Sequence, residues 1–148
     1  MIKNEISSKD TIVFQKILII LFSIIQLIIL LTLVFDFNVN TLYVWILVSL
    51  ISVWFLKKNL KTYFIYYDNS FIYIENAMKT KRKNIELFDK VLMTTFYGNY
   101  NMIFKDEENY NFKLIIKDNW FKQLGKDSQF YAVKLTNEIN LVKNKSIF

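Results

Sequence analysis

The sequence predicts a membrane-embedded α-helical hairpin followed by a cytoplasmic α+β domain, whose bent antiparallel sheet is capped by a C-terminal helix. Two uncharged apolar runs cover residues 17–35 and 39–56, and each is close to the length that spans a bilayer. From residue 62 onward, aromatic and β-branched residues form short runs separated by turn signals, which is typical of strands. Helical spacing returns near the C-terminus at Ala132, Leu135, Ile139 and Val142.

The first apolar run, residues 17–35, is predicted to be a membrane anchor that the mature protein keeps. As a helix rising about 1.5 Å per residue it extends roughly 28 Å, close to the thickness of the hydrocarbon layer. A signal peptide has a shorter apolar region of about 7–15 residues and a cleavage site of small residues, which does not follow this run. A buried helix of a soluble domain is less favoured, because a second apolar run with basic flanks comes next.

The second apolar run, residues 39–56, is predicted to return across the membrane after a short extracytoplasmic link of residues 36–38. Tyr43 and Trp45 near one end and Trp54 near the other match the aromatic belts that mark the two membrane interfaces. The link is short enough to require a tight turn between two antiparallel helices.

The basic residues beside the two runs predict that both chain termini lie in the cytoplasm. The chain has a formal net charge of +6, and cytoplasmic loops are the ones that carry an excess of Lys and Arg. The link carries Asp36 and no Lys or Arg, whereas residues 1–16 contain Lys3, Lys9 and Lys16. Three further lysines follow the second run directly, namely Lys57, Lys58 and Lys61.

Four polar side chains inside the two runs are predicted to make contacts between the helices. In an antiparallel pair, Gln26 lies at the same depth as Ser49. Ser23, one turn away on the first helix, lies at the same depth as Ser52. Such contacts hold neighbouring transmembrane helices together. A pore or a contact between protomers at Gln26 is the alternative, and the lack of ionisable residues within the runs argues against a transporter.

Residues 62–145 are predicted to form the cytoplasmic domain. Its first element is a β-hairpin of residues 62–67 and 71–75, joined by the turn-forming triplet Asp68–Ser70. Further strands are expected at residues 83–88, 91–97, 100–105 and 110–116. A short helical turn containing Trp120, Phe121 and Leu124 is expected to end at Gly125, and the C-terminal helix to be capped by Asp127 or Ser128.

Two segments of this domain carry a resemblance to a known family. These are KTYFIYYDNSFIYIE, residues 61–75, and KRKNIELFDKVLMTTF, residues 81–96. Together with the two preceding helices, they resemble small bacterial membrane proteins that carry a PH-like domain, including the YcxB-like group. The resemblance implies a PH-like fold at the bacterial cytoplasmic membrane. It carries no catalytic motif over to this chain.

A basic cluster is the first candidate for a functional surface. The predicted β-hairpin leaves the membrane after Lys61 and returns, which should bring the cluster back beside the lysines that follow the second helix. The residues concerned are Lys57, Lys58, Lys61, Lys79, Lys81, Arg82 and Lys83. Cations near an anionic leaflet contribute up to about 1 kcal/mol each. They either bind acidic lipid headgroups, or only set the orientation and hold the domain against the lipid.

The composition argues against most enzymes and against cofactor sites. The chain has no His and no Cys, so Ser-His-Asp and Cys-His arrangements and thiolate metal sites are excluded within it. The acidic run Asp106–Glu108 is expected to be a solvated turn rather than a cation site. Basic residues near aromatic ones are expected to serve packing rather than nucleic-acid binding. No catalytic residue, metal or cofactor is predicted.

The function expected from these features is that of a non-enzymatic, membrane-anchored binding or scaffold module. Its domain would contact lipid headgroups of the anionic inner leaflet or a protein partner, which includes a second copy of the chain. The alternative is an immunity protein that neutralises a cognate bacterial toxin at the membrane. A small pore and an enzyme using Asp, Glu, Lys or Tyr are less favoured hypotheses.

Overall fold

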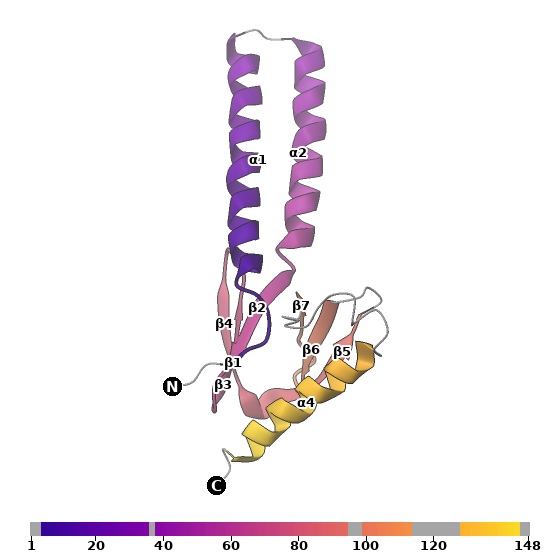
Figure 1. The fold of residues 1–148 in the computed structure, drawn as a ribbon. Helices are drawn as coiled ribbons and strands as arrows, with labels where there is room; N and C mark the ends of the chain where they lie inside the picture. The colour runs from indigo at the N-terminus through magenta and orange to yellow at the C-terminus, as the bar shows by residue number, and fades with distance from the viewer. Residues whose placement is uncertain (1–3, 36–37, 95–98, 114–127, 146–148) are drawn as a thin grey trace.

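The structure is a computed structural model that describes residues 4–35, 38–94, 99–113 and 128–145. Two long helices, α1 (Asp10–Phe35) and α2 (Val39–Asn59), lie antiparallel and project from one end of a sheet domain (Figure 1). The sheet domain ends in helix α4 (Ser128–Lys145), which lies along the sheet. The predicted order of a helical hairpin, a sheet and a C-terminal helix is confirmed.

Helices α1 and α2 are long and apolar enough to cross a membrane, and they mark the chain as a membrane protein. The most apolar 18-residue stretches of α1 and α2 have a mean hydropathy of 3.1 and 1.9, and only 6% of each stretch is buried within the protein. A core helix of a soluble domain would be mostly buried, so these surfaces are suited to lipid instead.

Both helices are longer than the apolar runs from which they were predicted. Helix α1 begins at Asp10 rather than at residue 17, and the backbone N–H of Asp10 donates to Ser8 Oγ at 3.1 Å. Helix α2 begins after Asn38, whose side chain accepts from the backbone N–H of Asn40, and it ends at Asn59. The sequence pattern reports where a helix is apolar, whereas its ends depend on these polar caps.

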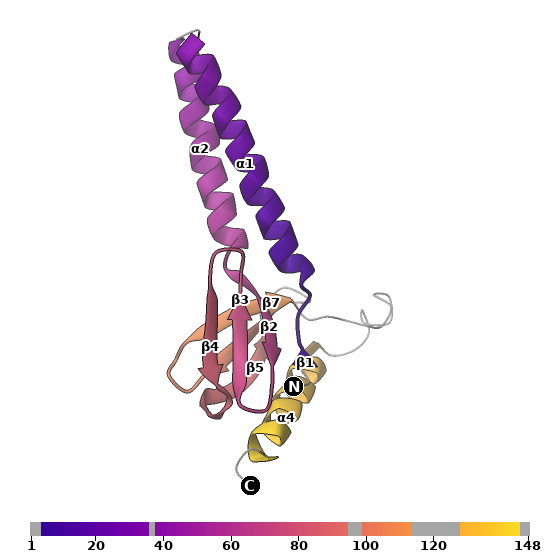
Figure 2. The ribbon, with the colours of Figure 1, turned by 90° about the vertical axis from the view of Figure 1, so that its left-hand side faces the viewer.

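Within the described residues, seven strands form one sheet with the order β4-β3-β2-β7-β6-β5, and β1 pairs with β2 beside this path. The strands are β1 (Asn4–Glu5), β2 (Thr62–Tyr67), β3 (Phe71–Glu75), β4 (Thr80–Asn84), β5 (Phe88–Met93), β6 (Asn99–Phe104) and β7 (Asn109–Lys113). Figure 2 shows β2, β3 and β4 side by side beneath the helices.

The prediction of a purely antiparallel sheet is wrong, because β2 and β7 pair in parallel. The pairing is short and joins Thr62 to Asn111 and Tyr63 to Phe112. The rest of β2 pairs antiparallel with β3, and its last two residues also pair with β1. The first residues of β2 therefore link two antiparallel sets, β2–β4 and β5–β7, into one mixed sheet.

The segment between β4 and β5 also differs from the prediction of strands at residues 83–88 and 91–97. A 3-10 turn, η1 (Ile85–Leu87), separates the two strands, and the side chain of Asn84 accepts from the backbone N–H of Glu86. An Asn side chain that bonds the backbone two residues on favours a turn over a continued strand. Residues 95–97, 114–116 and the predicted helical turn at Trp120–Gly125 lie outside the described residues.

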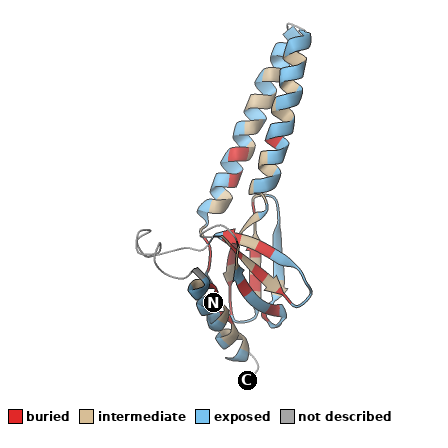
Figure 3. Cartoon of the chain, turned by 90° about the vertical axis from the view of Figure 1, so that its right-hand side faces the viewer, coloured by how far each residue is buried: buried red, intermediate tan, exposed pale blue. Residues whose placement is uncertain are grey.

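The core lies between the sheet and α4. Figure 3 shows the buried residues concentrated on the strands, while α1 and α2 are largely exposed. The predicted apolar face of the C-terminal helix packs there, with Ala132, Leu135 and Ile139 buried and Val142 partly buried. Thr136 Oγ accepts from the backbone N–H of Val91 at 3.0 Å, which ties α4 to strand β5.

Candidate functional site

The candidate site lies where the helices meet the sheet. Helix α2 ends at Asn59 and strand β2 starts at Thr62, so two residues separate the membrane helix from the sheet. The turn between β3 and β4 reaches the lower end of α2 (Figure 2). We call the residues where α1, α2, β2 and the β3–β4 turn meet the membrane junction.

Gln15 of α1 connects all parts of the membrane junction. Its side chain is 1% exposed. Its amide nitrogen donates to the backbone carbonyls of Asn59 at 2.8 Å and Thr62 at 2.7 Å. Its amide oxygen accepts from the backbone N–H of Ala77 in the β3–β4 turn at 2.9 Å. One side chain therefore satisfies backbone groups of α2, β2 and the turn, including a carbonyl at the end of a helix.

Asn76 makes a second set of bonds at the same place. Its side-chain nitrogen donates to the backbone carbonyl of Leu60 at 2.7 Å. Its side-chain oxygen accepts from the backbone N–H groups of Met78 and Lys79 at 3.0 and 2.9 Å. The side chain of this buried residue thus shapes the β3–β4 turn and holds it against the end of α2.

A groove of about 630 Å³ opens beside these bonds. We call it the junction groove, and its lining residues are Val53, Leu56, Lys57, Leu60, Lys61, Tyr63, Asn76, Met78 and Lys79. The side chain of Met78 is 73% exposed, and the three lysines are exposed as well. The lining of the groove therefore combines apolar residues of α2 with three cations.

The predicted basic cluster is divided by the structure. Lys57, Lys61 and Lys79 line the junction groove together. Lys58 lies over the Trp54 ring, with its Nζ 5.5 Å from the ring centroid. The guanidinium of Arg82 lies 4.4 Å from the centroid of Phe71. Three of the seven predicted cations therefore line one groove, and the contact of all seven with the membrane stays a prediction.

Lys81 and Lys83 have acidic partners in the turn between β6 and β7. Lys83 Nζ lies 2.5 Å from an Asp106 carboxylate oxygen and 2.8 Å from Glu108. Lys81 Nζ lies 3.4 Å from Glu108 and donates to the Tyr110 hydroxyl at 2.9 Å. The acidic run Asp106–Glu108 forms the turn that the sequence predicts. Its carboxylates balance the positive charges of two of the predicted cations.

These contacts lower the pKa values of two carboxyl groups in the acidic turn. Hydrogen bonds from Lys83 and then from the Tyr110 hydroxyl lower the pKa of Glu108 to about 2. The hydrogen bond from Lys83 also lowers the pKa of Asp106. For Lys83, burial acts to lower the pKa, but the bonds to both carboxylates raise it overall. The cluster is therefore fully charged at neutral pH and is a set of ion pairs between β4 and the β6–β7 turn.

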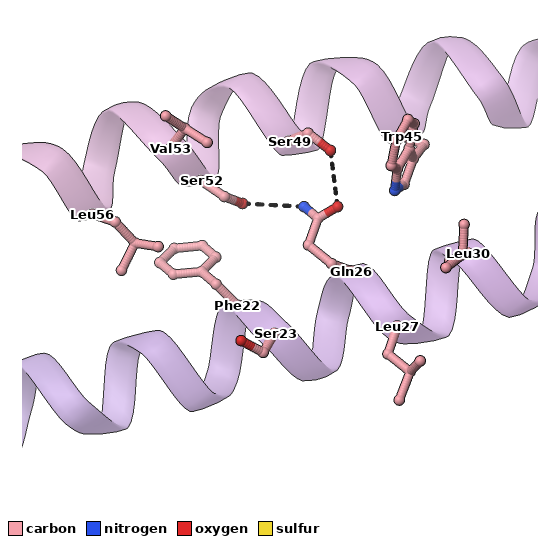
Figure 4. A pocket seen from close by; sticks show the side chains of 10 residues that line it. All are labelled: Phe22, Ser23, Gln26, Leu27, Leu30, Trp45, Ser49, Ser52, Val53 and Leu56. Carbon is pink, nitrogen blue, oxygen red and sulfur yellow. Dashed lines mark hydrogen bonds between the residues drawn. The ribbon is translucent and has the colours of Figure 1, made fainter.

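The polar residues inside the membrane helices make a second, smaller site (Figure 4). Ser49 Oγ donates to Gln26 Oε1 at 2.8 Å, and Gln26 Nε2 lies 3.5 Å from Ser52 Oγ. Ser23 does not take part in the expected pair with Ser52, because its Oγ donates to the backbone carbonyl of Ile19 in its own helix at 2.8 Å. Gln26 therefore contacts both serines of α2.

These polar groups lie in an otherwise apolar groove of about 540 Å³ between α1 and α2. The Trp45 indole also lines it, and its Nε1 is buried with no hydrogen-bond partner in the described part of the chain. In Figure 4 the indole points toward α1 near Leu30. The bonds at Gln26 join the two helices, as expected of polar groups in lipid.

Sequence reasoning missed Gln15 and Asn76. A Gln next to the apolar run of a helix and an Asn in a turn are ordinary in sequence, and neither has a spacing that signals its partners. Among the described residues, no group of three or more acidic, His or Cys side chains could hold a metal ion. Comparison with known proteins found no matching family model, no similar curated protein and no similar solved structure.

Proposed function

We propose that this chain is a non-enzymatic integral membrane protein whose cytoplasmic domain acts as a binding module at the inner face of the bacterial cytoplasmic membrane. In this proposal both termini are cytoplasmic. The primary contact of the domain is with the anionic headgroups of the inner leaflet, and the surface so positioned is open to a protein partner.

We further propose that the domain is PH-like and related to the YcxB-like group. Support comes from the two antiparallel strand sets β2–β4 and β5–β7, which are followed by a C-terminal helix packed on β5. The parallel pairing between β2 and β7 joins the sets at their edge. A bent sheet with a helix over its open side buries one apolar face of each element.

The observation that carries the proposal is the bonded membrane junction. Gln15 and Asn76 hold the β3–β4 turn against the end of α2, so the domain cannot swing away as it would on a flexible linker. Lys79 of this turn is thereby held beside Lys57 and Lys61. Lysines at the end of a membrane helix favour the cytoplasmic side and attract an anionic leaflet.

Depth measurement in vesicles tests this function. The chain has no native cysteine, so Met78→Cys in the β3–β4 turn and Asn69→Cys in the β2–β3 turn each accept one fluorophore. We expect brominated lipids to quench the label at residue 78 strongly and the label at residue 69 weakly. In mixed vesicles at low salt, quenching at residue 78 should be stronger when phosphatidylglycerol carries the bromine than when phosphatidylcholine carries it.

Two outcomes would count against the proposal. Equal quenching at residues 78 and 69 would mean that the turn does not lie at the membrane. Equal quenching at residue 78 by brominated phosphatidylglycerol and by brominated phosphatidylcholine at low salt would remove the anionic headgroups as the contact. Recovery of a stoichiometric toxin by crosslinking in native membranes would instead support the immunity alternative.

A further inference from the structure

We propose that the junction groove binds one anionic glycerophospholipid, with the phosphate among Lys57, Lys61 and Lys79 and the start of an acyl chain along Val53 and Leu56. The inference rests on the proposed function, since it requires the groove to face the inner leaflet. It goes further by naming a single binding site and the chemistry of its ligand.

The order of the lining residues along α2 matches the order of groups in a phospholipid. Val53 and Leu56 belong to the apolar part of the helix, and Lys57 follows directly. At about 1.5 Å per residue, Val53 lies roughly 6 Å further into the membrane than Lys57. Apolar contacts therefore occur at the depth of acyl chains and cationic contacts at the depth of phosphates. A soluble anion would gain nothing from contact with the apolar residues Val53 and Leu56.

The charges of the groove lack acidic partners within the described part of the chain. The ion pairs of the described residues engage Lys9, Lys81, Lys83 and Lys134, and none engages Lys57, Lys61 or Lys79. Lys79 instead has its Nζ 5.9 Å from the centroid of the Tyr63 ring. Three cations that share one groove repel each other, and an external anion relieves this repulsion.

The groove is formed before any ligand binds. Asn76 is 7% exposed and Gln15 is 1% exposed, and their bonds fix the turn that carries Met78 and Lys79 relative to α2. A site whose backbone is already held in place loses less entropy on binding. A volume of about 630 Å³ is in the range of small-molecule sites and is suited to a phosphate, its glycerol and the first part of one chain.

Lipid retention by the full-length protein tests the inference. The detergent-solubilised protein is stripped of lipid, titrated with phosphatidylglycerol or phosphatidylcholine, and examined for bound lipid by native mass spectrometry. We expect one phosphatidylglycerol to bind in preference to phosphatidylcholine. Lys57→Gln/Lys61→Gln/Lys79→Gln should weaken this binding about tenfold or more, since each lysine near an anionic lipid contributes up to about 1 kcal/mol.

Two further variants separate the groove from general charge effects. Lys16→Gln/Lys58→Gln/Lys90→Gln removes the same charge from exposed lysines outside the groove and should change binding less than about twofold. Val53→Trp keeps every lysine and fills the apolar part of the groove at a residue that is 65% exposed. It should reduce binding of phosphatidylglycerol but not the weak binding of soluble glycerol phosphate.

The results that would overturn the inference are distinct from failure of the proposed function. An equal loss in the two triple variants would mean that charge acts without a site. Two results together would assign the groove to free phosphate. Inorganic phosphate would compete with lipid equally well in wild-type protein and in Val53→Trp, and Val53→Trp would leave lipid binding unchanged. If the residue 78 label is still quenched more by brominated phosphatidylglycerol than by brominated phosphatidylcholine in these cases, the proposed function stands and only the single-lipid site is lost.

Discussion

The side-chain amide of Gln15 donates a hydrogen bond of 2.7 Å to the backbone carbonyl of Thr62 and so joins the N-terminal part of α1 to the first residue of β2. The same amide bonds the last residue of α2 and the β3–β4 turn. The membrane hairpin and the sheet are therefore connected by a side chain as well as by the chain itself. Because of these bonds, the fold itself sets the position of the sheet domain relative to α1 and α2.

Replacement of Gln15 by Leu should lower the free energy of unfolding by about 2–4 kcal/mol, because each buried polar group left unpaired costs about 1–3 kcal/mol. Thermal unfolding in detergent measures the loss, and hydrogen exchange at the Ala77 amide locates it. Gln15→Glu is the matched variant, since it keeps an acceptor for Ala77 but loses both donors. Wild-type stability and a protected Ala77 amide in Gln15→Leu would contradict the assigned role.

The bond between Gln26 and Ser49 should stabilise the helical hairpin by about 0.6–2 kcal/mol. A double-mutant cycle with Gln26→Leu and Ser49→Ala in detergent measures the coupling free energy directly. Ser23→Ala serves as the control, because Ser23 bonds only within α1 among the contacts described. A coupling near zero, or an effect of Ser23→Ala as large as that of Ser49→Ala, would rule out the observed pairing.

Thr136→Val should destabilise the attachment of α4 to β5. Valine has nearly the shape of threonine but cannot accept the hydrogen bond from the backbone N–H of Val91, and an unpaired amide costs about 1–3 kcal/mol. Unfolding experiments should show this loss, with faster hydrogen exchange at the Val91 amide. Thr80→Val on the exposed strand β4 is the control. Equal stabilities of the two variants would argue against the contact.

The acidic turn should make stability depend on pH in the acid range. The pKa of Glu108 is lowered from 4.5 to about 2 by Lys83 and Tyr110, so its ionised form stabilises the folded state. That contribution is complete above the ordinary pKa of 4.5 and is lost as the pH falls through about 2. The midpoint of thermal unfolding, measured across this range, should fall less steeply in Glu108→Gln than in the wild type.

Glu107→Gln provides the comparison for this titration. Glu107 is the neighbouring residue in the same turn, and the ion pairs described for the turn do not include it. Its variant should keep the wild-type dependence on pH. Should Glu107→Gln flatten the curve as much as Glu108→Gln does, the dependence would arise from net charge rather than from the pairs with Lys81 and Lys83.

The elements that the sequence predicted well are those with a local signal. The strands at residues 62–67 and 71–75 have the predicted bounds, because the alternation and the turn at Asp68–Ser70 are contained in the segment itself. Strand β1 was missed, since its two residues, Asn4 and Glu5, form a strand only by pairing with Tyr67 and Tyr66. The parallel pairing of β2 with β7 likewise depends on residues far apart in the sequence.

The same distinction applies to the candidate sites. The pairing of Gln26 with Ser49 followed from equal depth in an antiparallel hairpin, which is a strong constraint in lipid. Ser23 departed from that rule because a Ser in a helix can satisfy itself on the preceding turn. The ion pairs of Lys81 and Lys83 with the acidic turn at Asp106–Glu108 were not visible in the sequence, because the two segments lie far apart along the chain.

The central claim, a binding module at the inner face of the membrane, is tested most directly by the sidedness of the chain. Asn40→Cys lies at the start of α2 and Lys90→Cys lies on strand β5 of the sheet domain, and the chain offers no other cysteine. A membrane-impermeant maleimide applied to intact spheroplasts should modify Asn40→Cys, and should modify Lys90→Cys only after the membrane is permeabilised. Modification of Lys90→Cys in intact spheroplasts would contradict the account, because the domain would then face away from the inner leaflet.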